Sequence, residues 1–241
     1  MRRGVEMETF LQFGNRIDAF EKRISDFGDG RFAVNRSLAR KVSADNSFAD
    51  YYGDTVVFAL NDEMKDRIEQ IMSTLRTAVP QCFCEKLVPS TYHMTLHDLS
   101  NSAKLSDCAE QMFYNELKIA GLSNALQKFR GVEIVMKSNY VFNMVGTSLV
   151  MGLRPIDEEN YRLLADLYSL FDGVVCLNYP MTPHVTLAYY NVNGFSAVDA
   201  RELKNTVDIV NAQTELTFSV RELYYQKFTS MNDYTDIIQL L

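Results

Sequence analysis

The chain has 241 residues, of which 47% are hydrophobic and 23% are charged, and this ordinary globular composition excludes a disordered chain. The formal net charge of −7 argues against a broad binder of duplex DNA, which needs a basic face to neutralise phosphates. A nucleotide or short RNA end held in a local pocket remains compatible with this charge. No secretory signal or membrane-spanning run is recognised, so we expect a cytoplasmic protein with no membrane partner.

The first part of the chain predicts one helix followed by a polar segment. Apolar residues recur every three or four positions, which indicates a helix stopped by Gly28-Asp29-Gly30: Phe10, Phe13, Ile17, Phe20, Ile24 and Phe27. Residues 31–50 look polar and irregular. We therefore expect residues 1–50 to form an N-terminal helical extension that docks on the core of the protein.

The remaining residues predict strands and helices in two similar sets. In the first set we expect strands at 55–60, 82–87 and 92–99, and helices at 64–75, 103–119 and 123–129. In the second set we expect strands at 131–144, 148–153 and 184–190, and helices at 157–171 and 197–212. Two strands, 215–228 and 234–240, complete the chain.

This alternation predicts an α+β fold with an internal repeat. No linker divides the two sets, so residues 51–241 are expected to form one compact, two-lobed domain. Its repeats cover roughly residues 51–120 and 130–213, and residues 215–241 supply closing strands. The oligomeric state stays open.

The four cysteines are Cys82, Cys84, Cys108 and Cys176. Cys82 and Cys84 would share one face of a strand. The sequence contains no pair of C-x-x-C units, the spacing that would indicate a structural zinc site. We expect reduced thiols, no bound metal and no cofactor.

Two hexamers with the pattern T-x-H-x-T-L contain two of the three histidines. They are Thr91-Tyr92-His93-Met94-Thr95-Leu96 and Thr182-Pro183-His184-Val185-Thr186-Leu187. Because side chains alternate along a strand, the histidine and the second threonine of each hexamer share one face. If the repeats face each other across a pseudo-two-fold axis, the two pairs converge on one cleft.

Such a cleft suits cleavage of a phosphodiester without a metal. One imidazole would take a proton from the attacking oxygen, and the other would give a proton to the leaving oxygen. The hydroxyl groups of Thr95 and Thr186 would donate hydrogen bonds to the non-bridging phosphate oxygens. We therefore predict His93 and His184 as catalytic residues and the two threonines as phosphate-binding residues. The alternative, structural histidines among threonines that simply favour strands, leaves the repetition unexplained.

Two further residues are candidates for the wall of the cleft. His97 shares the alternating face of His93, and Tyr190 shares the face of His184. A strand-end position for His97 and strand packing for Tyr190 are the alternative interpretations. A three-histidine zinc site built from His93, His97 and His184 would leave the repeated threonines without a role.

At these hexamers the sequence resembles the two-histidine (2H) phosphoesterase superfamily, which includes RNA 2′,3′-cyclic phosphodiesterases. His93 to Leu96 and His184 to Leu187 match its two H-x-T motifs, each followed by a hydrophobic residue. The stretch from Tyr52 to Thr95 also looks like a bacterial branch of this superfamily.

The resemblance implies a bilobal fold of two pseudo-symmetric α/β repeats with antiparallel sheets around a central cleft. It also implies metal-independent hydrolysis of a 2′,3′-cyclic or 2′-5′ phosphodiester in a nucleotide or RNA end. A non-catalytic binding module for the same ligands and an RNA 2′-5′ ligase-like activity are the alternatives.

Overall fold

The computed structural model describes residues 8–24, 27–28, 30–213 and 216–241. The first seven residues, on which the expectation about a secretory signal depends, lie outside the described residues. Asp29, which belongs to the predicted end of the first helix, also lies outside them. The described helices are α1 (Phe10–Ile24), α2 (Asp62–Ala78), α3 (Ala109–Ala120), α4 (Ser123–Leu126), α5 (Glu158–Asp172) and α6 (Ala197–Gln213). The described strands are β1 (Tyr52–Ala59), β2 (His93–Ser102), β3 (Ile134–Met144), β4 (Ser148–Pro155), β5 (His184–Tyr189), β6 (Thr217–Val220), β7 (Leu223–Ser230) and β8 (Asp233–Gln239).

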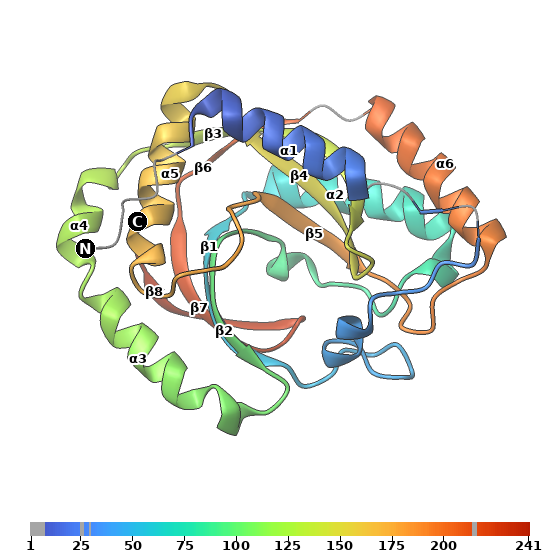
Figure 1. Cartoon of the computed structure of the whole chain (residues 1–241), viewed down its shortest axis with the longest axis horizontal. Coiled ribbons are helices and arrows are strands. Elements are labelled where there is room, and N and C mark those ends of the chain that lie inside the picture. The colour runs from blue at the N-terminus through green and yellow to red at the C-terminus, as the bar shows by residue number, and fades with distance from the viewer. Residues whose placement is uncertain (1–7, 25–26, 29, 214–215) are drawn as a thin grey trace.

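The strands form one curled antiparallel sheet in the order β6-β3-β4-β5-β2-β1-β7-β8 (Figure 1). Each half contributes four strands, and the halves meet between β5 and β2. The register there contains a single pair, Met94 opposite Val185. The predicted α+β class with two similar halves is thus confirmed, and the two halves share one continuous sheet.

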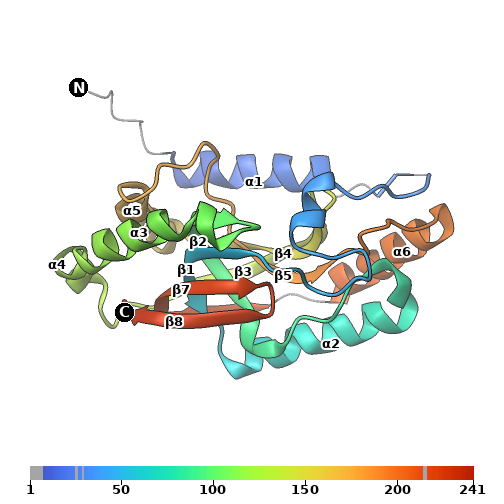
Figure 2. The same ribbon diagram turned by 90° about the horizontal axis from the view of Figure 1, so that it is seen from below.

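The helices lie on both sides of this sheet. Helix α2 packs against α6, and α5 packs against β3 and β4. Figure 2 shows α1 along one side of the sheet and α2 along the opposite side. Helix α2 buries an apolar stripe, and it begins where the Asn61 side chain accepts a hydrogen bond from the Met64 backbone N–H at 2.8 Å.

Two predicted strands differ from the observed structure. Residues 82–87 form no strand, because Pro80 begins a short 3₁₀ helix and only Phe83 then makes an isolated bridge, to Tyr190. The predicted strand 215–228, whose first residue is not described, is divided into β6 and β7. These two strands pair with β3 and β1, respectively, in opposite halves of the sheet. The hydrophobic pattern of the sequence does not show that residues 215–228 are divided into two strands, because both segments have the composition of a strand.

The segment between α1 and β1 contributes to the main core, although it was predicted to be polar and irregular. Phe32, Leu38 and Val42 are buried there. Phe32 also forms a bridge with Phe195, and a 3₁₀ helix occupies Arg36–Arg40. This segment therefore holds a fixed position beside the two repeats.

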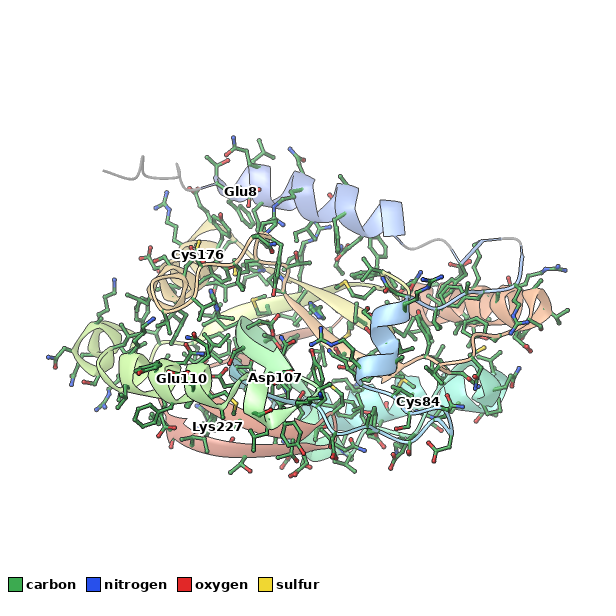
Figure 3. All side chains as sticks on the ribbon, turned by 60° about the horizontal axis from the view of Figure 1, so that its bottom comes forward. Glu8, Cys84, Asp107, Glu110, Cys176 and Lys227 are labelled. Carbon is green, nitrogen blue, oxygen red and sulfur yellow. The ribbon has the colours of Figure 1, made fainter. Side chains whose placement is uncertain are left out.

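The cysteines form no disulfide. Cys82, Cys84 and Cys108 are buried, whereas Cys176 is exposed. Figure 3 shows Cys84 and Cys176 far apart in the molecule. Burial raises the pKa of both the Cys82 and Cys84 thiols to about 12, so these thiols are inert at neutral pH.

Helix α1 docks on the second half of the sheet through an apolar cluster and a buried carboxyl group. Phe13 and Ile17 pack against Tyr161 of α5. Glu21 is only 2% exposed and accepts a hydrogen bond from the Asn139 amide. Its burial raises the pKa of the carboxyl to about 7, although the nearby Arg154 opposes this shift.

This raised pKa predicts that stability falls as the pH rises. Between pH 4.5 and 7 the folded chain keeps a proton on Glu21 that the unfolded chain releases, so folding weakens across this window. We expect Glu21→Gln to remove this loss and to stabilise the fold at pH 8 by up to about 3 kcal/mol, with little change near pH 4. Urea unfolding of both proteins at the two pH values measures the difference. An equal difference at both pH values would contradict the buried neutral carboxyl.

Candidate active site

The two hexamers meet at the middle of the sheet. Because β2 and β5 are antiparallel and Met94 lies opposite Val185, His93 is placed opposite Thr186, and Thr95 opposite His184. Met94 and Val185 are fully buried and anchor the pair. This arrangement has the pseudo-two-fold relation that the repeat suggested.

All four polar side chains line one cavity of 920 Å³. His93, Thr95, His184 and Thr186 are each half-buried, so the cavity gives a ligand access to them. A cavity of this size is within the range that encloses a small ligand. The structure therefore brings together the four residues that the hexamers single out.

A β-bulge follows the second threonine in each hexamer. Thr95 and His97 pair with the consecutive residues Val57 and Val56, so Leu96 is the extra residue of β2. In the same way, Thr186 and Ala188 pair with Val150 and Leu149, so Leu187 is the extra residue of β5. A bulge shifts the alternation of side chains by one residue.

These bulges overturn the two predictions about the cavity wall. His97 and Tyr190 do not line the cavity; Asp98 and Tyr189 line it instead. Each of these two lies three residues after its threonine. A prediction from strictly alternating strand side chains places Asp98 and Tyr189 away from the cavity, although their equal spacing from the two threonines is visible in the sequence.

His97 is buried and does not line the cavity. Its Nδ1 lies 2.6 Å from the Asp98 backbone oxygen, and its Nε2 lies 3.5 Å from the Asp172 carboxylate. Its ring also contacts Tyr168, at 4.7 Å between ring centroids. The three histidines consequently do not form one ligand set. No cluster of three metal-ligating side chains is found within the described ranges.

Tyr190 is fully buried in an aromatic cluster rather than placed beside a ligand. Its ring lies 5.1 Å from Phe32, 5.8 Å from Phe195 and 6.3 Å from Phe83, measured between centroids. Its role is packing between β5 and the segment that precedes β1.

Backbone carbonyl groups orient the two cavity histidines in equivalent ways. The Nδ1–H of His184 donates to the carbonyl oxygen of Thr182 at 2.7 Å. The carbonyl of Thr91, also two residues earlier, makes the corresponding interaction with His93. A carbonyl can only accept, so the Nδ1 of His184 carries the proton and its Nε2 is left as the basic nitrogen.

Burial lowers the pKa of both imidazoles. The pKa of His93 falls from 6.5 to about 4, and the pKa of His184 is also lowered. In both cases the Asp98 carboxylate opposes this shift, whereas the Lys41 ammonium adds to it. Both histidines are therefore neutral at neutral pH when the cavity holds no anion.

Sequence analysis missed the contributions of the N-terminal 50 residues to the cavity wall. Arg16, Ala19 and Phe20 of α1 and Lys41 of the following segment line it. Neither segment carries a sequence pattern that places it beside the hexamers. Aromatic side chains cover much of the remaining wall: Tyr51, Tyr168, Tyr179, Tyr189, Phe228 and Tyr234.

No model of a known protein family and no curated protein matches the sequence. Similar solved structures exist, however. A conserved protein of unknown function from Agrobacterium tumefaciens has a TM-score of 0.65 and 16% identity, over 86% of this chain and 94% of that one. Escherichia coli LigT has a TM-score of 0.50 both in complex with 3′-AMP, at 15% identity, and in the apo form, at 17% identity. Both LigT comparisons cover 79% of this chain and 97% of the LigT chain.

The chain thus has the fold of LigT. The resemblance found in the hexamers is confirmed at the level of the fold. Within the described ranges, no helix is both long and apolar enough to cross a membrane.

Proposed function

We propose that this protein is a phosphodiesterase that needs no metal and hydrolyses a 2′,3′-cyclic or 2′-5′ phosphodiester of a nucleotide or RNA end. The observation that carries this proposal is the meeting of two histidine–threonine pairs in one cavity, across the central strand pair. The fold that it shares with LigT, and the 3′-AMP bound to LigT, support a nucleotide as the ligand.

The proposed reaction uses one imidazole as a base and the other as an acid. The Nε2 of one neutral histidine takes a proton from water as the water oxygen bonds to phosphorus. The bond from phosphorus to the leaving ribose oxygen breaks, and the second histidine, as imidazolium, gives that oxygen a proton. The hydroxyl groups of Thr95 and Thr186 donate hydrogen bonds to the non-bridging oxygens. The product of a cyclic substrate is a phosphomonoester with one free hydroxyl.

The cavity and the charge of the chain support a small substrate. Helix α1 supplies part of the wall, and the net charge of −7 opposes long contacts with polynucleotide. We propose a mononucleotide, a dinucleotide or the end of an RNA as the substrate, acting in the cytoplasm.

A turnover assay tests this function. We expect the protein to open 2′,3′-cyclic nucleotides, or to cleave 2′-5′ dinucleotides, at a rate that excess EDTA leaves unchanged. Calorimetry with 2′-AMP and 3′-AMP distinguishes the alternative of a binding module. Tight binding with no product from any cyclic or 2′-5′ substrate would contradict the hydrolase and support the module. Incubation with RNA ends tests ligation, which uses the same residues in reverse.

A further inference from the structure

Lys41 is a cation on the cavity wall that belongs to neither repeat. It follows the 3₁₀ helix Arg36–Arg40, and its backbone N–H donates to the Leu38 carbonyl at 2.8 Å. The buried side chains of Leu38 and Val42 anchor the backbone on either side of it. The position of Lys41 is therefore fixed by the core and does not depend on a mobile loop.

Two tyrosines hold the Lys41 side chain. Its Nζ lies 5.4 Å from the centroid of the Tyr51 ring and 5.2 Å from that of Tyr189, within the range of cation–π contacts. Tyr189 is the cavity-facing residue that follows the bulge in β5. The second repeat therefore places this tyrosine against Lys41. The first repeat has Asp98 at the corresponding position, and the Asp98 carboxylate accepts a hydrogen bond from the Tyr179 hydroxyl at 2.8 Å.

The ammonium group has no ion-pair partner. Among the residues that the structure describes, no carboxylate oxygen lies within 4.0 Å of Lys41 Nζ. The side chain is half-buried, and an incompletely hydrated cation with no carboxylate in direct contact favours an anionic ligand. Burial opposes the charged form of Lys41, but Tyr189, Tyr51 and Asp98 together outweigh it and raise the pKa, so the group stays charged.

Among the residues whose side chains the structure describes, the other cation of the cavity wall is already paired. Arg16 forms a salt bridge with Glu8 at 2.8 Å and donates to the Met181 carbonyl at 3.0 Å. The two histidines are neutral at neutral pH, and the threonines are uncharged. A phosphodiester carries a negative charge, and among these described side chains Lys41 is the cation left to neutralise it.

We propose, on the basis of the proposed function, that Lys41 binds the phosphoryl oxygens of the substrate. The ligand class is a phosphate ester or free phosphate, recognised through charge as well as through the threonine hydroxyl groups. In this arrangement the two repeats supply the proton-transfer groups, and the segment before them supplies the charge.

Binding measurements with a matched pair of variants test this assignment. Arg40 is the control, because it adjoins Lys41 and lies 5.3 Å from the same Tyr51 ring, but it is exposed and does not line the cavity. We expect Lys41→Met to weaken the binding of 3′-AMP and inorganic phosphate by about 10- to 100-fold, as expected for losing hydrogen bonds to a charged group. The affinity for adenosine, which has no phosphate, should not change, and Arg40→Met should affect none of the three.

Kinetics and folding separate ligand binding from a structural role. We expect Lys41→Arg to recover most of the phosphate affinity, because it keeps the charge. Removing the charge should also move the alkaline limb of the pH profile of kcat/KM to higher pH, since Lys41 lowers the pKa of both histidines. Thermal unfolding checks the fold, and if Lys41→Met does not fold, Lys41→Gln replaces it.

The outcomes distinguish this inference from the proposed function. If the histidine variants lose turnover while Lys41→Met binds 3′-AMP as tightly as the wild type, Lys41 does not bind phosphate and the phosphodiesterase stands. If the wild type has no turnover but Lys41→Met loses affinity for phosphate, the anion site stands and the hydrolase does not. Failure of the wild type to bind either 3′-AMP or phosphate overturns the assignment of Lys41.

Discussion

Replacing either cavity histidine with alanine is expected to lower kcat by about 10²- to 10⁴-fold, the usual range for loss of a general acid or base. His93 and His184 lie on adjacent central strands and line one cavity. In the proposed reaction each histidine performs one of two coupled proton transfers, so turnover should depend on both. The double variant should be little slower than the slower single variant, since residues that act as a unit do not contribute additively.

The third histidine provides the matched control. His97 is buried and does not line the cavity, and it contacts Tyr168 and Asp172. We expect His97→Gln to keep turnover within a few-fold of the wild type wherever thermal unfolding shows that it folds. Initial rates on a 2′,3′-cyclic nucleotide, with EDTA present, measure all four variants. Full activity in His93→Ala or His184→Ala would refute the catalytic assignment.

The pH dependence of kcat/KM is expected to be bell-shaped, with its optimum below pH 6.5 and a fall of about tenfold per pH unit on the alkaline side. The mechanism requires one neutral and one protonated imidazole. Burial lowers the pKa of both, to about 4 for His93, so the free protein loses its general acid as the pH rises through the acidic range. The pair loses its two protons in two steps, which set the two limbs of the profile.

The profile of kcat should differ from that of kcat/KM in a defined way. A bound phosphate anion favours the imidazolium, so the alkaline limb of kcat should lie at higher pH than that of kcat/KM. Steady-state kinetics between pH 4 and 9 measure both profiles. A kcat/KM that is flat or rising above pH 7 would contradict the role of an imidazolium as general acid in the free protein.

Local sequence was sufficient for the class of fold and for the four central residues of the site. The alternation of a strand puts His93 with Thr95 and His184 with Thr186, and this depends only on backbone geometry within each hexamer. The apolar periods of the helices are equally local. The repetition of the hexamer then indicated that the two pairs belong together.

Contacts between distant segments decided the rest. The bulges at Leu96 and Leu187 exist because of pairing with β1 and β4, and they turn Asp98 and Tyr189 toward the cavity in place of His97 and Tyr190. The positions of α1 and Lys41 depend on packing against the second half of the sheet and the main core.

The sequence by itself therefore determined the histidine and the threonine that each central strand presents to the cavity. Only the tertiary structure determined which other groups surround them, because strand register and cavity walls arise from contacts between residues far apart in the chain.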